Sequence, residues 1–267
     1  MAENIDAITQ MRTIAWLRDT QRAAGAKGAS SLANRYAKLT LHRQFDSDAR
    51  LAPKEFKPYA KGETAPSKDT LREVDEVLPG TWDTFRLGPR ENPHDRHCLL
   101  WLALGGPGAV LREVILDLDP AGISARYARS TSFHSLLLDI FQLLGVTEDM
   151  LWDGITHDRM NDDDHVVTTA VAEQNLHVSL RLLTTAIAVW RLSIEINSDI
   201  PLTTYVMLGL HQSIAEPLLE PFGIYEHFKA YIQRGILHAF EMLAIEAARE
   251  ERYAQLTRAE NDTEPTA

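Results

Sequence analysis

The stretch HVVTTAVAEQNLHVSLRLLTTAIAVWRLSIEIN, residues 165–197, places apolar side chains along two separate stripes at helical spacing. A helix with two apolar stripes needs neighbours on two sides. We therefore expect one long helix here, at the centre of an all-α bundle, with further helices at about 130–145, 203–216 and 222–253. The first stripe consists of Val167, Val171, Val178, Leu182, Ala186 and Val189, and the second of Leu176, Leu180, Leu183, Ile187, Trp190 and Ile194.

Shorter helices are predicted in the first third of the chain. The first of them ends near the glycine-rich residues 23–31. Ser30 or Ser31 is expected to cap the second helix, and Ser67 the third, because a serine hydroxyl can accept a hydrogen bond from a free backbone N–H of the first turn. The expected buried faces consist of Ile5, Ile8, Met11, Ile14 and Leu17 in the first helix, Leu32, Tyr36 and Leu39 in the second, and Leu71, Val74 and Leu78 in the third.

Charge is unevenly distributed along the chain. In total there are 27 Lys and Arg against 38 Asp and Glu, a formal net charge of −11 at pH 7. Residues 12–72 contain 13 basic and 6 acidic residues, whereas residues 100–267 contain 11 basic and 24 acidic ones. The total excludes a uniformly basic nucleic-acid coat protein, but the division predicts a basic surface near the N-terminus.

These patterns predict a small N-terminal helical domain followed by a larger α-helical bundle domain. The basic first domain is expected over residues 1–87 and the acidic bundle over 98–254. The segment GPRENPHDRH, residues 88–97, is rich in Pro, Gly and charge and is predicted to be a linker. Residues 255–267 are polar without periodicity and are predicted to form a disordered tail.

The sequence favours a cytoplasmic protein. Its first residues, MAENIDAITQ, contain two acids and no continuous apolar run, so they do not resemble a secretory signal. The most apolar segment, residues 178–194, is interrupted by Arg181 and Arg191, which argues against a membrane span. The single cysteine, Cys98, lies in an apolar run and cannot form an intrachain disulfide.

One segment carries a functional signal. In FKPYAKGETAPSKDTLREVDEVLPG, residues 56–80, a glycine is followed four residues later by Pro-Ser and then by an apolar helical pattern. This arrangement, within residues 31–80, resembles the second half of Cro/CI-type helix-turn-helix DNA-binding domains. The matching positions are Gly62, Pro66, Ser67, Leu71, Val74 and Leu78.

The resemblance implies a recognition helix that precedes Gly62 and lies in the major groove of DNA, with basic side chains around it contacting phosphates. Pro58 falls inside that expected helix, where it removes a backbone hydrogen bond. No Arg, Asn or Gln lies between Ala52 and Lys68, so no residue is assigned to read bases. The alternative to DNA binding is that the Gly-x-x-x-Pro-Ser pattern only ends one helix and begins the next, with the lysines on a solvated face. The predicted DNA-binding residues are Arg43, Arg50, Lys54, Lys57, Lys61 and Lys68.

Two polar pairs at helical spacing define a third hypothesis. Glu173 and His177 lie on the long helix, and His238 and Glu241 lie on the last one. If these helices pack together, the pairs could line a groove that binds a metal or a small anion. Their spacing does not match the Glu-x-x-His pattern of di-iron bundles, and a helix-surface ladder explains them equally well. We therefore predict no metal and no cofactor.

Our principal prediction is a DNA-binding regulatory protein and not an enzyme. The N-terminal domain would contact double-stranded DNA, and the C-terminal helices would mediate homodimerisation or bind a protein partner. Dimerisation is expected because one short helix reads few base pairs, so two symmetric half-sites supply affinity. The alternative is a helical adaptor that binds proteins and no nucleic acid. The third possibility is a helical-bundle enzyme that uses the two Glu/His pairs.

Overall fold

The computed structural model describes residues 6–41, 55–118, 135, 179–213 and 215–261. Within these residues the protein is all-α, as predicted, with ten α-helices, two 3-10 turns and no strand. The helices are α1 (Ala7–Ala23), α2 (Ala29–Leu41), α3 (Lys68–Val77), α4 (Thr81–Arg86), α5 (Leu100–Gly105), α6 (Gly108–Leu118), α11 (Leu180–Glu195), α12 (Ile200–Ser213), α13 (Ala215–Leu219) and α14 (Tyr225–Asn261), and the 3-10 turns are η1 (Lys57–Tyr59) and η2 (Glu220–Phe222).

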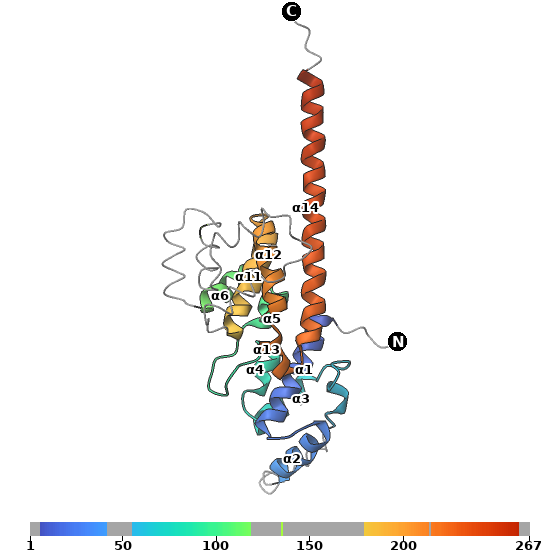
Figure 1. Cartoon of the computed structure of the whole chain (residues 1–267). Coiled ribbons are helices and arrows are strands. Elements are labelled where there is room, and N and C mark those ends of the chain that lie inside the picture. The colour runs from blue at the N-terminus through green and yellow to red at the C-terminus, as the bar shows by residue number, and fades with distance from the viewer. Residues whose placement is uncertain (1–5, 42–54, 119–134, 136–178, 214, 262–267) are drawn as a thin grey trace, which may run out of the picture.

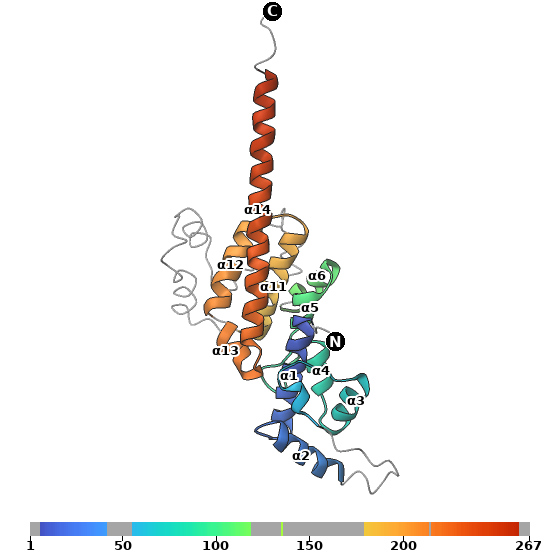
Figure 2. The same cartoon turned by 90° about the vertical axis from the view of Figure 1, so that its right-hand side faces the viewer.

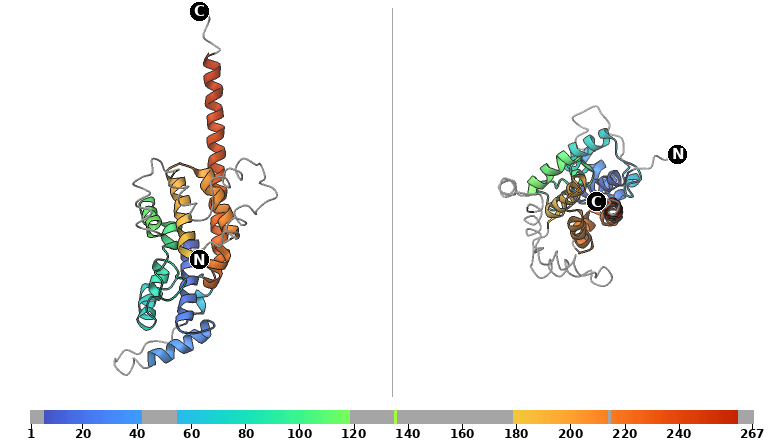
Figure 3. Two further views of the ribbon diagram at one scale, coloured as in Figure 1. Left: turned by 60° about the vertical axis from the view of Figure 1, so that its left-hand side comes forward. Right: turned by 90° about the horizontal axis from the view of Figure 1, so that it is seen from above.

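The described helices form an elongated arrangement. Figure 1 shows α2 and α3 at one end, α11 and α12 in the middle, and the second half of α14 projecting from the opposite end. The same projection is seen after a quarter turn in Figure 2 and from the side in Figure 3. No helix in the described part of the chain is long and apolar enough to cross a membrane.

Two hydrophobic clusters hold these helices together. The first, called here the Trp16 cluster, joins the second half of α1 to α2, α3 and η1. The second, called here the α11 cluster, joins α5, α6, α11, α12 and α14. Helix α1 belongs to both, because Met11, Ile14 and Ala15 are buried in the α11 cluster. The Trp16 cluster consists of Trp16, Leu17, Leu32, Tyr36, Phe56, Leu71, Val74 and Leu78.

The helix predicted at residues 165–197 begins later than expected. Ser179 has an extended backbone and its hydroxyl accepts a hydrogen bond from the Leu182 backbone N–H at 3.2 Å, so α11 begins at Leu180. A side-chain cap of this kind competes with helix continuation, which the apolar period alone does not reveal. Residues 165–178 and most of the helix predicted at 130–145 lie outside the described residues.

The predicted contact of α11 on several sides is confirmed, because its side chains from Leu182 to Trp190 are all buried. Trp190 donates from Nε1 to Thr204 Oγ1 of α12 at 3.2 Å. On α14, a Cβ at Gly235 would lie 2.5 Å from the Trp190 ring, so a glycine is needed for this close approach. These contacts place α11 at the centre of its cluster.

The last helix is longer than predicted. Helix α14 extends to Asn261, so the first part of the predicted disordered tail is helical and only residues 262–267 lie outside the described chain. Near its middle it is joined to the residues after α11 by a hydrogen bond from Asn197 Nδ2 to Glu246 Oε1 at 3.0 Å. Beyond that point the described side chains, to Gln255, are exposed.

In the first third of the chain, the apolar faces of α1 and α3 are largely confirmed. Met11, Ile14 and Leu17 are buried, and so are the three residues predicted for α3. In α2, however, Leu39 is 43% exposed, whereas Thr40 is 4% exposed. Four-residue spacing from the buried Leu32 and Tyr36 points position 40 inward and turns position 39 away. The prediction that Leu39 is buried was therefore wrong.

Candidate nucleic-acid interface

The lysine loop, defined as residues 55–68, is held against α1 by two aromatic side chains. Phe56 precedes η1 and Tyr59 is its last residue, and their ring centroids lie 6.3 Å and 5.4 Å from that of Trp16. Trp16 is fully buried. Because Phe56 and Tyr59 turn toward Trp16, the lysines beside them, Lys57 and Lys61, remain exposed.

A second attachment fixes the far side of the loop. Gln10 of α1 donates from Nε2 to the Lys61 carbonyl at 3.1 Å. The next residue, Gly62, has a φ of 69°, and a Cβ there would lie 2.6 Å from Gln10 Cγ. A residue with a side chain would be strained in this left-handed conformation and would also clash with α1. The glycine of the helix-turn-helix-like pattern therefore allows the loop to approach α1.

The loop ends at the cap of α3. As predicted, Ser67 is the N-cap: its Oγ accepts a hydrogen bond from the Thr70 backbone N–H at 3.1 Å. Lys68 is the first residue of the helix and is exposed. Tyr36 donates to the Glu73 carbonyl at 3.1 Å, which joins α3 to α2.

The expected recognition helix is not present at residues 56–61. This segment forms the single 3-10 turn Lys57–Tyr59, closed by a hydrogen bond from the Ala60 N–H to the Lys57 carbonyl at 3.1 Å. Pro58 explains the difference, because its ring is tolerated in a first turn but its missing N–H opposes a longer α-helix. The basic side chains here therefore project from an anchored loop.

Three of the six predicted DNA-binding residues can be placed. Lys57, Lys61 and Lys68 are exposed, and none of them makes an ion pair or a side-chain hydrogen bond in the described part of the chain. All three lie on the lysine loop. The other three, Arg43, Arg50 and Lys54, lie outside the described residues.

Nearby arginines differ from these lysines in having carboxylate partners. Arg72 contacts Asp69 at 3.2 Å, and Arg86 contacts Asp83 at 2.9 Å, both across one helical turn. Lys38 of α2 was not among the predicted DNA-binding residues, but it is also exposed and makes no ion pair among the described residues. Its place two residues after the buried Tyr36 on an amphipathic helix could have indicated that it points to solvent.

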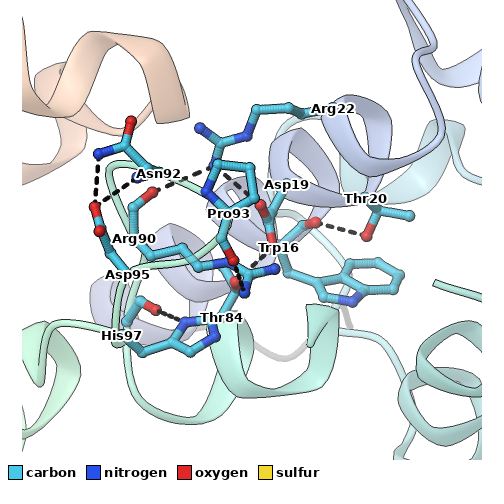
Figure 4. Close-up of polar contacts among 11 residues, drawn as sticks. Trp16, Asp19, Thr20, Arg22, Thr84, Arg90, Asn92, Pro93, Asp95 and His97 are labelled. Carbon is cyan, nitrogen blue, oxygen red and sulfur yellow. Dashed lines mark hydrogen bonds and ion pairs between the residues drawn. The ribbon is translucent and has the colours of Figure 1, made fainter. Parts of the chain in front are cut away.

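A buried carboxylate joins the first helix to α4. Asp19 is 4% exposed and accepts a hydrogen bond from Thr84 Oγ1 at 2.7 Å, while Arg22 Nη2 lies 2.9 Å from its other oxygen. Figure 4 shows these groups converging from α1, α4 and residues 88–97. The Thr84 carbonyl in turn accepts from Trp101 Nε1 at 2.7 Å, which extends the connection to α5. Asp19 therefore lies where the two clusters meet.

The segment predicted as a linker, residues 88–97, has a hydrogen-bonded structure of its own. Arg90 Nη1 donates to the Pro93 carbonyl at 2.8 Å, and Asn92 Nδ2 donates to Asp95 Oδ2 at 2.7 Å (Figure 4). His97 Nδ1 lies 2.7 Å from the Gly88 carbonyl. The turn therefore positions Cys98 and α5 after it.

Only one of the two Glu/His pairs lies within the described residues. Glu173 and His177 lie outside the described residues. His238 and Glu241 lie on α14 with their side chains 69% and 63% exposed and 3.9 Å apart, as a surface pair across one turn. Among the described residues, no group of three or more His, Cys, Asp or Glu side chains is arranged to hold a metal ion.

Comparisons with known proteins do not assign the chain to a family. No family model matches it, and neither does any curated protein or solved structure.

Proposed function

We propose that this protein is a DNA-binding regulatory protein whose lysine loop contacts the phosphates of double-stranded DNA. The observation that carries the proposal is the group of three exposed lysines, Lys57, Lys61 and Lys68, that have no carboxylate partner in the described structure. Ammonium groups that are free of ion pairs can neutralise phosphates without first breaking a contact. Arg43, Arg50 and Lys54 are proposed to extend the same surface.

The anchoring of the loop supports this function. Phe56 and Tyr59 pack on Trp16, and Gln10 holds the Lys61 carbonyl, so the backbone that carries the lysines is fixed from both sides. A fixed backbone lowers the entropy lost when the loop binds a rigid duplex. The proposed contacts position the protein on DNA and read no bases, because phosphate contacts carry no direct sequence information.

Two carboxylates in the same loop set the expected strength of binding. Glu55 and Glu63 are exposed beside the lysines. They oppose a phosphate surface, so the loop alone is expected to bind weakly and with strong salt dependence. Binding by a dimer would increase the affinity, because the second contact on one duplex becomes intramolecular.

The test is the salt dependence of duplex DNA binding in a paired variant. Changing Lys57 and Lys61 to Glu should weaken binding strongly and should reduce the slope of log affinity against log salt by about 2, since each phosphate contact contributes about 0.9. Fluorescence anisotropy of a labelled duplex at several salt concentrations measures both quantities.

A matched control changes charge elsewhere by the same amount. Arg112 lies on α6 and Lys229 on α14, both away from the lysine loop. The variant with both changed to Glu should keep most of the salt slope of the unmodified protein. Equal slopes in the unmodified protein and in the Lys57/Lys61 variant would contradict the proposal.

A second candidate function, a helical adaptor that binds another protein, is favoured by a different observation. The second half of α14 projects from the bundle, and its described side chains are exposed (Figure 1). If this is the function, deletion of residues 247–261 should abolish binding of the protein partner and should leave DNA binding by the monomer unchanged.

A further inference from the structure

Helix α14 has an exposed side along its packed half. The side facing the bundle is apolar and buried at Phe228, Ile232 and Ile236. On the opposite side, Leu237 is 61% exposed and Ile245 is 68% exposed. This side of the helix is therefore open to a second molecule.

The projecting half of α14 is exposed among the described residues. After the hydrogen bond between Asn197 and Glu246, about 15 residues continue to Asn261 with exposed side chains as far as they are described. Most of the stability of a helix in a protein comes from packing one of its faces against another surface. A contact with a second surface would stabilise this half.

We propose that the covering molecule is α14 of a second copy of this chain, packed antiparallel. The back face of α14, defined as His238, Glu241, Ile245, Ala248, Arg252 and Gln255, follows the alternating three- and four-residue spacing of a helix-pairing seam. A two-fold axis between residues 246 and 247 would place Ile245 against Ala248 of the second copy. The same register would place Glu241 against Arg252 of the second copy.

Charge selects this partner and this orientation. In the antiparallel register, both Glu241 side chains meet an arginine, so the face is complementary to itself. A parallel pairing in register would place Glu241 against Glu241 and Arg252 against Arg252, which is repulsive. The side of the packed half away from the bundle, at Arg234, Leu237 and Glu241, is exposed and can receive the projecting half of the second copy.

This inference deepens the dimerisation included in the proposed function, but the dimer itself needs no DNA. The test is sedimentation equilibrium of the full chain without DNA, in charge-exchanged variants. Glu241→Arg and Arg252→Glu should each weaken dimerisation by about tenfold or more, since each change creates two like-charged contacts across the two-fold axis. The double variant restores both pairs with inverted sign and should dimerise like the unmodified chain.

The controls separate pairing from folding and from DNA binding. Glu250 lies on the side of the projecting half away from the back face, so Glu250→Arg should leave the dimer unchanged, and circular dichroism should show the same helix content in all variants. The Lys57/Lys61 variant should dimerise normally even where it fails to bind DNA. A monomeric unmodified chain, or a double variant that stays as weak as the single ones, would overturn the antiparallel pairing.

Discussion

The two hydrophobic clusters are built in different ways. The Trp16 cluster joins short elements through aromatic rings, with the Tyr36 and Phe56 ring centroids 5.6 Å apart and Phe56 next to Trp16. The α11 cluster is much larger, and most of its members are aliphatic side chains repeated at helical spacing, such as Leu183 and Ile187, although it also contains Trp101 and Trp190. A small core depends strongly on each of its large side chains, whereas a large core spreads the free energy over many positions. We therefore expect the lysine loop to be the part most sensitive to a single substitution.

The largest expected effect comes from Trp16→Ala. Removing a fully buried Trp from a packed core costs about 3–5 kcal/mol, from lost transfer free energy and from the cavity left behind. Phe56 and Tyr59 lose their common neighbour, so lysine-loop DNA binding should fall as well. Urea unfolding followed by circular dichroism measures the loss. Leu39→Ala, at an exposed position of the same region, should change the free energy of unfolding by less than about 0.5 kcal/mol.

Cys98 shows whether the two clusters unfold together in that variant. The thiol is buried in the α11 cluster, and burial raises its pKa to about 12, so it should react with a thiol reagent only after unfolding. Because α1 is shared, Trp16→Ala should accelerate this reaction in proportion to its loss of stability. If Trp16→Ala unfolds the Trp16 cluster but leaves the reaction rate of the Cys98 thiol unchanged, the two clusters unfold independently.

Much of the fold follows from local sequence. The apolar period predicted α1 and α3, and the Ser67 cap was predicted because a hydroxyl before an apolar helical pattern can bond the first free N–H groups. The start of α11 at Leu180 was missed, because apolar spacing continues across Ser179 whether or not the backbone is helical. A helical period detects an apolar face but not the residue at which a helix begins.

The candidate interface was less predictable, because its supports are distant in sequence. Gln10 and Lys61 are 51 residues apart, and Asp19 and Thr84 are 65 apart. Nothing in the local sequence around either pair specifies that they meet. The lysines themselves were predicted from charge and from the helix-turn-helix resemblance, whereas their placement on a 3-10 turn depends on Pro58.

The junction between the clusters gives the next largest effect. Asp19→Asn removes the charge from a buried group that accepts from Thr84 and contacts Arg22, and should cost about 1–3 kcal/mol. Asp83→Asn is a matched control, since Asp83 also lies 2.9 Å from an arginine three residues later but its side chain is 45% exposed. That change should cost under about 0.5 kcal/mol. Equal losses in urea unfolding would show that Asp19 does not hold the clusters together.

A smaller effect is expected at the end of the lysine loop. Ser67→Ala removes the N-cap of α3 and should cost about 1 kcal/mol, because the Thr70 N–H loses its acceptor. Ser30→Ala is the comparison: Ser30 lies inside the first turn of α2, is exposed, and was one of two serines predicted to cap that helix. Thermal unfolding should separate the two variants, and an equal shift in both would argue against the Ser67 cap.

The smallest effect concerns the start of α1 and depends on pH. The Thr9 hydroxyl and the Thr9 and Ile8 backbone N–H groups donate to Asp6, and these hydrogen bonds lower the pKa of its carboxyl below the ordinary value of 3.8. A lowered folded-state pKa means that Asp6 contributes stability above its unfolded pKa and loses it as the pH falls through the folded value. Asp6→Asn keeps an N-cap acceptor without a titrating charge, so the variant should be less stable by under about 1 kcal/mol at neutral pH. That difference should shrink toward zero in urea unfolding as the pH falls through the lowered pKa of Asp6 in the folded protein. Asp6 caps α1, the helix that both clusters share. If the difference in the free energy of unfolding stays constant across this pH range, the charge of the carboxylate does not stabilise the helix.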